Sequence, residues 1–138
     1  MANYCGTTRT NYFRVTDEEK YKEIIDKIDC ECGLDFWEET DEKGVKRHGF
    51  GGYGSLYAYD EETGDDMLDD VLESLTEVLP EDEAIIITEI GNEKLRYLVG
   101  QAVIVTRSMI QFVDLQSVAL ATARSMLENP DFVTQLDY

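Results

Sequence analysis

Apolar residues recur along the chain with the spacings that helices and strands require. A first helix is predicted over 17–29, where a Thr16–Glu19 capping box precedes four apolar residues at helical spacing: Tyr21, Ile24, Ile25 and Ile28. A second is predicted up to Pro80 from the clearest apolar stripe in the chain: Leu68, Val71, Leu72, Leu75, Val78 and Leu79. A third is predicted from a cap at Asp114 to about Leu127.

Strand patterns fill most of the remaining sequence. They predict strands over 12–15, 34–39 and 54–59, followed by a meander over 84–90, 94–106 and 109–113. The mixed order of strands and helices predicts an α+β fold, with three helices packed on one face of an antiparallel sheet. The last helix is rich in small residues, so we expect it to pack closely on that sheet. No linker or repeat divides the chain, and residues 1–138 are predicted to form one domain.

Charge is distributed unevenly along the sequence. Twelve Lys and Arg against thirty Asp and Glu give a net charge of −18. Residues 1–48 carry eight basic and twelve acidic side chains, residues 49–93 carry fourteen acidic and no basic ones, and residues 94–138 carry four of each. DNA, RNA and anionic membranes would repel such a chain, so we predict no direct binding to nucleic acid and no membrane.

The cysteine count and the N-terminal sequence bear on the compartment. Three cysteines are an odd number, which is unsuited to a secreted disulfide framework. Neither a signal peptide nor an apolar stretch of membrane-spanning length is apparent. These features predict a protein of the reducing cytoplasm.

Catalytic motifs are sparse. A single histidine leaves little room for a Ser-His-Asp or Cys-His arrangement. Residues 49–54 match G-x-G-x-x-G, but no strand is predicted before them and no helix after them, so a Gly-rich turn or bulged strand entry is favoured. We predict that the protein is not an enzyme. The alternative is a metal-dependent enzyme that uses the carboxylates of Asp65, Asp66, Asp69 and Asp70.

The second predicted helix carries a concentrated acidic face. Six carboxylates follow one another here, and all but the first lie opposite the apolar stripe: Asp65, Asp66, Asp69, Asp70, Glu73 and Glu77. Like charges four residues apart oppose helix formation, by about 1–2 kcal/mol for the four pairs in this run. Two interpretations remain: a solvated face that keeps the protein soluble, or a surface that occupies a Lys- and Arg-lined groove meant for nucleic acid. Tyr57 and Tyr59, predicted to be exposed nearby, complete the candidate partner-binding set.

The soft metal ligands of the chain also form a candidate set. Three cysteines and one histidine, Cys5, Cys30, Cys32 and His48, have the composition of a structural zinc site. Four protein ligands would leave no open position for catalysis. The alternative is that the cysteines are small buried hydrophobic residues and that His48 is an exposed turn residue.

Taken together, a short acidic chain with a basic-free segment from Gly49 to Glu93 and no catalytic motifs resembles the anti-CRISPR proteins. The runs Asn11-Tyr12-Phe13-Arg14-Val15 and His48-Gly49-Phe50-Gly51-Gly52-Tyr53-Gly54-Ser55 are similar to those of small mobile-element proteins of Gram-positive bacteria. The resemblance implies an inhibitor, in a bacterial host cell, that binds a type II CRISPR effector nuclease and blocks loading of its target DNA. The group shares no fold or motif, so no functional residue is carried over.

Two other kinds of protein fit the same acidic surface. An antirestriction DNA mimic would use it against a different nuclease. A small acidic adaptor or antitoxin would use it to neutralise a basic protein. In all three interpretations the partner is a basic protein, and in the first two it is one that binds nucleic acid.

Overall fold

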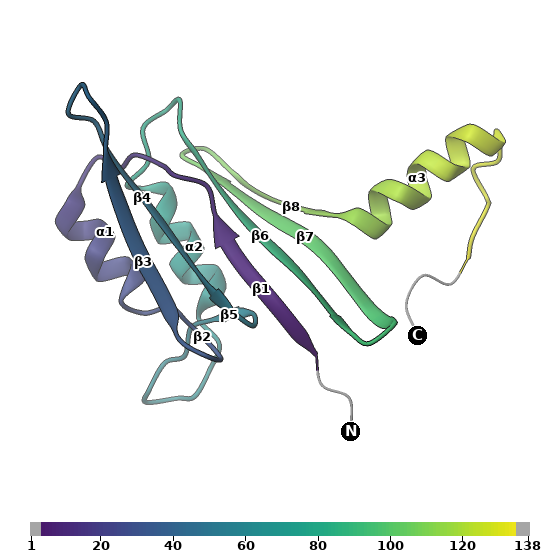
Figure 1. Ribbon diagram of the computed structural model, residues 1–138, viewed down its shortest axis with the longest axis horizontal. Helices are drawn as coiled ribbons and strands as arrows, with labels where there is room; N and C mark the ends of the chain where they lie inside the picture. The colour runs from purple at the N-terminus through teal and green to yellow at the C-terminus, as the bar shows by residue number, and fades with distance from the viewer. Residues whose placement is uncertain (1–3, 135–138) are drawn as a thin grey trace.

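A six-stranded antiparallel sheet in the order β3-β4-β1-β6-β7-β8 organises the chain, and a two-stranded sheet of β2 and β5 lies beside it (Figure 1). The computed structural model describes residues 4–134, with the backbone alone at 96 and 97. The elements are β1 (Cys5–Thr10), α1 (Glu18–Ile25), β2 (Asp29–Cys30), β3 (Leu34–Thr40), β4 (Lys46–Tyr53), β5 (Leu56–Tyr57), α2 (Leu68–Thr76), β6 (Ala84–Glu93), β7 (Arg96–Thr106), β8 (Ile110–Asp114) and α3 (Leu115–Leu127).

Two helices, α1 and α2, cover one face of the large sheet (Figure 1). Their apolar stripes turn inward, because residues three and four apart on a helix share a face. The core holds the buried side chains of these stripes and of the strands beneath them: Tyr21, Ile24, Ile25, Val71, Leu72, Leu75, Phe50, Ile85, Ile87 and Val105. The α+β class and the antiparallel sheet are therefore confirmed.

The register between β3 and β4 decides which side chains face the helices. Glu38 pairs with His48, and Trp37 pairs with Gly49. Paired residues share a face of the sheet and neighbours along a strand alternate. Glu38 and His48 therefore lie on the face that α1 and α2 cover, whereas Trp37 lies on the opposite, open face of the sheet.

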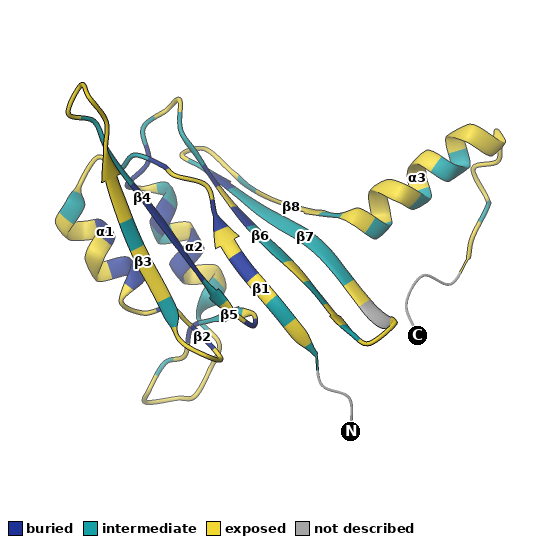
Figure 2. Ribbon diagram, in the orientation of Figure 1, coloured by how far each residue is buried: buried dark blue, intermediate teal, exposed yellow. Residues whose placement is uncertain are grey.

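The third helix departs from the expectation. Asp114 caps it as predicted, since its Oδ1 atom accepts a hydrogen bond of 2.7 Å from the Ser117 amide. However, α3 extends away from the sheet and contains no buried residue (Figures 1 and 2). The prediction that it packs closely on the sheet with the other two helices is wrong. Within the described residues, no helix is both long and apolar enough to cross a membrane.

Several element boundaries also differ from the predicted ones. The first strand is β1, whereas Phe13 makes only an isolated bridge to His48 and contributes to the core from a loop. The predicted strand over 54–59 is short β5, and the glycine-rich segment before it is the eight-residue strand β4. Helix α1 is capped by Asp17, not Thr16, and ends at Ile25.

Candidate functional site

The acidic surface is built from α2 and the loop that precedes it. The Tyr59–Asp66 bridge closes the base of this loop, and the Met67 amide donates a hydrogen bond of 2.6 Å to the Ala58 carbonyl. Helix α2 then begins at Leu68 with its apolar stripe on the sheet, which leaves its carboxylates in solvent. We define the acidic face as five exposed residues: Asp65, Asp66, Asp69, Asp70 and Glu73.

These five carboxylates are not neutralised within the protein. Among the side chains that the structure describes, no cation lies within ion-pair distance of any of them, although carboxylates elsewhere are paired. Lys20, for example, lies 2.7 Å from Glu77, and this hydrogen bond holds the pKa of the Glu77 carboxyl below its usual value. Glu77 therefore joins α2 to α1, and differs in this respect from the other carboxylates of the predicted partner-binding set.

The start of α2 corrects one part of the sequence argument. Because the helix begins at Leu68, Asp65 and Asp66 precede it and form no helical i,i+4 pairs. The Asp66 side chain instead accepts a hydrogen bond from the Leu68 amide. Asp69 and Asp70 lie in the first turn, where the helix dipole favours negative charge. Glu73 lies four residues from both Asp69 and Glu77, whose negative charges repel it. It also lies beyond the first turn, so the helix dipole does not stabilise its charge.

A single substitution isolates this repulsion. We expect Glu73→Gln to raise the free energy of unfolding by about 0.3–1 kcal/mol, since it removes like-charge pairs at i,i+4 on an exposed surface. Asp69→Asn, in the first turn, is the control and should give no gain. Urea unfolding at low salt measures both. A gain for Asp69→Asn as large as that for Glu73→Gln would contradict this division of the charges.

Two tyrosines adjoin the acidic face. The rings of Tyr57 and Tyr59 lie 5.0 Å apart, centroid to centroid, and the Tyr59 backbone pairs with Asp66. Tyr59 is 60% exposed, as predicted, whereas Tyr57 is half-buried. Desolvation, followed by the charge of Asp29, raises the pKa of Tyr57. The predicted aromatic and acidic members of the set therefore share one end of the molecule.

The four predicted zinc ligands are not brought together. Cys30 is buried with its Sγ atom against Gly52, whereas His48 is buried four residues earlier on β4, about 13 Å away at the usual rise of a strand. Cys5 and Cys32 are exposed. Within the described residues, no group of three or more His, Cys, Asp or Glu side chains is arranged to hold a metal ion. The arrangement does not fit one zinc site, and zinc binding stays an untested prediction.

The environment of Cys30 indicates an unreactive thiol. Burial, followed by the charge of Asp29, raises the pKa of this thiol to about 11. A thiol with such a pKa is almost entirely protonated at neutral pH, and the thiolate is the form that attacks electrophiles and binds metals. Cys30 therefore acts as a small core residue, as the alternative interpretation of the cysteines held.

His48 does not lie in an exposed turn. Its Nε2 atom is 2.6 Å from Oε2 of Glu18, and its Nδ1 atom is 4.0 Å from Oε2 of Glu38. The imidazole packs on the Tyr21 ring at a centroid distance of 4.6 Å. Through these contacts His48 joins the first turn of α1 to β4.

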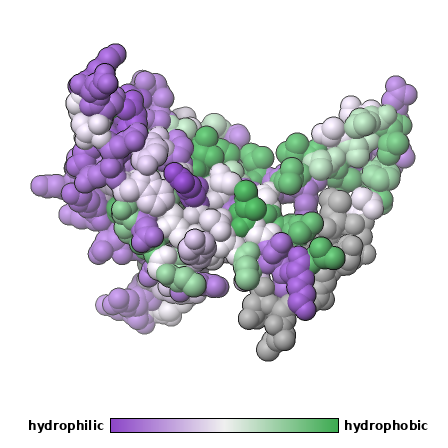
Figure 3. Space-filling view, in the orientation of Figure 1, coloured by the Kyte–Doolittle hydropathy of each residue, from purple (hydrophilic) through white to green (hydrophobic). Residues whose placement is uncertain are grey.

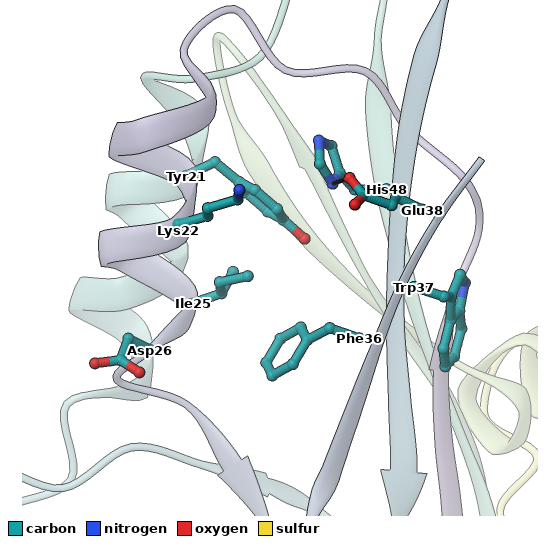
Figure 4. Close-up of a pocket in the computed structure, with 8 residues that line it drawn as sticks. All are labelled: Tyr21, Lys22, Ile25, Asp26, Phe36, Trp37, Glu38 and His48. Carbon is teal, nitrogen blue, oxygen red and sulfur yellow. Dashed lines mark ion pairs between the residues drawn. The ribbon is translucent and has the colours of Figure 1, made fainter. Parts of the chain in front are cut away.

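A pocket of about 300 Å³ opens beside this histidine, between α1 and β3 (Figure 4). Tyr21, Phe36 and Glu38 contribute to its lining. Burial and the nearby Glu18 and Glu38 raise the pKa of the Tyr21 hydroxyl, so this group is protonated at neutral pH. The lining also contains Lys22, Asp26 and His48, and this arrangement alone assigns no reaction to the pocket. The prediction that the protein is not an enzyme stays a prediction.

The sequence analysis missed two features of the surface. On the open face, the Arg9 guanidinium lies over the Trp37 ring, 5.3 Å from its centroid. At the far end of the sheet, β8 and α3 expose large apolar side chains. A signal for the second feature exists in β7, whose near-continuous apolar run over 98–105 is typical of a strand covered on both faces.

Comparisons with known proteins add no relative. No protein-family model, curated protein or solved structure matches the chain. The functional argument therefore depends on the geometry and charge of this chain alone.

Proposed function

We propose that this protein is an inhibitor that binds the Lys- and Arg-lined channel of a nucleic-acid-binding protein through its acidic face. The observation that supports this proposal is that the five carboxylates of α2 and its preceding loop are exposed and lack cationic partners in the described chain. Asp66, Asp69 and Asp70 favour the start of α2, whereas Glu73 is left with like-charge repulsion. The negative charge of the face is not neutralised by the described side chains and is available to a partner.

The physical basis of binding is that of nucleic acid itself. A basic channel that takes up acidic side chains in place of phosphates satisfies its cations in the same way, and the gain declines as salt screens the charges. Helix α2 supplies a rigid support, since its buried stripe is anchored by Val71, Leu72 and Leu75. Tyr59 adds an exposed aromatic ring beside the charges, a residue type enriched in interface hot spots.

The partner that we propose is a type II CRISPR effector nuclease. Such effectors hold their guide–target duplex in positively charged channels and read a short motif through arginine side chains. The acidic face is complementary to either feature. Bound there, the protein would exclude target DNA from the channel, or hold a basic lobe and prevent closure around the DNA.

A gel-shift competition tests the proposal. Guide-loaded type II effectors are mixed with this protein, and their binding to labelled target DNA is followed at low and at physiological salt. We expect the protein to displace DNA, with an inhibitory concentration that rises steeply with salt. Unchanged DNA binding and cleavage for every effector in the panel would contradict the proposal.

Matched variants decide whether the acidic face carries the effect. The test variant removes four charges by Asp65→Asn, Asp69→Asn, Asp70→Asn and Glu73→Gln. The control removes four exposed charges without ion pairs around β3, by Glu31→Gln, Asp35→Asn, Glu39→Gln and Glu42→Gln. The test variant should inhibit at least ~10-fold more weakly, whereas the control should remain within ~3-fold of the original chain, because only close charges contribute strongly to a specific interface. Equal losses would mean that overall charge, and not this face, drives inhibition.

A further inference from the structure

The end of the molecule formed by β6, β7, β8 and α3 exposes an apolar surface. Figure 3 shows hydrophobic side chains gathered over α3 and the neighbouring strands, opposite the hydrophilic end of the molecule. We define the C-terminal surface by six side chains that are 43–80% exposed: Ile90, Leu98, Val113, Leu115, Val118 and Met126. Charged residues are few here, and residues 94–138 carry no net charge.

Helix α3 meets the sheet through its first turn, and near its end the Arg124 Nε atom donates a hydrogen bond of 2.8 Å to the Phe132 carbonyl. The Gln116 side chain donates a hydrogen bond of 2.9 Å to the Leu98 carbonyl, and Leu115 lies against Gly100 of β7. Beyond this turn the 13-residue helix has no buried residue, although Leu115, Val118 and Met126 form an apolar stripe along it. A helix of this length is marginal in water without tertiary contacts. Its stripe therefore requires a cover that residues 4–134 do not supply.

The two edge strands of the large sheet differ in how well they are protected against pairing with a further strand. At one edge, β3 carries the acidic residues Asp35, Glu38 and Glu39, which discourage pairing with a further strand. At the other edge, β8 carries Phe112 and Val113 exposed. Its sequence Ile-Gln-Phe-Val-Asp contains neither lysine nor proline, and the Asp114 carboxylate is engaged in capping α3. Only the β8 edge is open to a partner.

The size of the C-terminal surface fits a stable interface. Half-exposed large side chains contribute roughly 100 Å² each, so the six residues and the smaller ones between them offer on the order of 800 Å² per molecule, as each partner buries in a standard interface. The largest apolar patch of a typical monomer is about 300–600 Å². An area of this size is more than a monomeric protein ordinarily leaves in water.

The charge distribution favours a second copy of this chain as the partner that covers the C-terminal surface. Two chains that each carry −18 repel one another over most of their surfaces. The neutral segment 94–138 is where two copies approach without this repulsion, and its helix α3 lies at the end of the molecule away from α2 (Figure 1). A two-fold arrangement places the same apolar stripe and the same uncovered strands on both partners.

We propose that two copies of this chain pair through the C-terminal surface, with α3 of each copy lying on the uncovered β7 and β8 strands of the other. The pairing covers the apolar stripe of α3 and the exposed Val113 on the open face of β8 in one arrangement. It also leaves both acidic faces free at opposite ends of the dimer. The inference stands on the apolar surface and the charge distribution, and does not depend on the proposed function.

Sedimentation equilibrium of the full chain from 1 to 100 μM tests the pairing. We expect a mass of twice the 15.7 kDa of one chain, and a dissociation constant that does not rise with salt, because the contact is apolar and salt screens the repulsion between the two acidic chains. A mass of one chain throughout this range would overturn the proposal, and would mean that some other molecule covers the surface.

Two substitutions locate the interface. Met126→Glu on α3 and Val113→Glu on β8 each place a charge on the C-terminal surface, and each should raise the dissociation constant at least tenfold. Ala121→Glu is the control, because Ala121 is exposed on the side of α3 away from the stripe; it should change the constant less than threefold. Circular dichroism verifies that each variant is folded. A dimer that persists in both test variants would place the contact elsewhere and overturn the proposal.

Discussion

Replacing Phe13 by alanine should lower the free energy of unfolding by about 3–5 kcal/mol, the usual cost of removing a fully buried phenylalanine side chain. Phe13 is 0% exposed, although it lies in a loop. Its ring packs edge-on against Tyr21 of α1 at 5.6 Å and against Phe50 of β4 at 6.2 Å, centroid to centroid. The substitution therefore leaves a cavity where the helical layer meets the sheet.

The backbone of Phe13 makes its position rigid. Its amide donates a hydrogen bond of 2.9 Å to the His48 carbonyl, and its carbonyl accepts one of 2.7 Å from the His48 amide. These bonds hold the loop on β4, so neighbouring side chains have little freedom to fill the cavity. A loss of this size is a large fraction of the 5–15 kcal/mol that stabilises a typical domain.

The neighbouring Tyr12 provides the control. Tyr12 is 38% exposed, so Tyr12→Ala should cost less than about 1 kcal/mol. Urea unfolding followed by circular dichroism gives both values under one set of conditions. If the two substitutions cost the same, the Phe13 ring would not be the link between α1, β4 and their loop that its contacts indicate.

Local patterns in the sequence predicted the helices and the C-terminal meander well. The stripe from Leu68 to Leu79 and the cap at Asp114 are features of neighbouring residues, so they can be recognised without knowledge of the fold. The same holds for the acidic face, whose carboxylates lie within nine residues of one another. The spatial arrangement of the candidate zinc ligands could not be predicted in this way, because it depends on distances between residues far apart in the chain, such as His48 and Cys30.

The third helix shows a different limit of sequence reasoning. The apolar stripe through Val118 and Met126 indicates that α3 needs to be covered, but it does not indicate by which surface. We assigned it to the sheet of its own chain, whereas the structure leaves it uncovered there. An amphipathic pattern predicts which face of a helix is buried. It does not predict whether that face packs against the same chain or against another molecule.

The sequence pattern does not predict strand β4, because several of its residues are glycines. The run Gly49-Phe50-Gly51-Gly52 has low intrinsic strand propensity and was interpreted as a turn or a bulged strand entry. In the structure, Gly49 and Gly51 face the open side of the sheet, where the Trp37 indole lies directly over them. The absence of two side chains makes room for one large ring. Here a tertiary contact overrides local propensity.

This role of the glycines leads to the second large effect. A Cβ atom at Gly51 would lie 2.7 Å from the Thr8 carbonyl oxygen and 3.0 Å from the Trp37 ring. The carbonyl belongs to the backbone of β1, the central neighbour of β4, and cannot move without disturbing the strand pairing. We therefore expect Gly51→Ala to lower the free energy of unfolding by about 1–3 kcal/mol, the usual cost of overpacking.

Gly100→Ala is the matched control for Gly51→Ala, because Gly100 is also a strand glycine without a positive φ. A Cβ atom there would meet only the Leu115 side chain, at 3.3 Å and beyond. Alanine also loses less conformational entropy on folding than glycine, so the control should remain within about 0.5 kcal/mol of the original stability. Thermal and urea unfolding at one protein concentration measure both variants. Equal stability of the two would show that β1 and Trp37 yield to an added methyl group, and that the glycines of β4 are not required for the close approach of its neighbours.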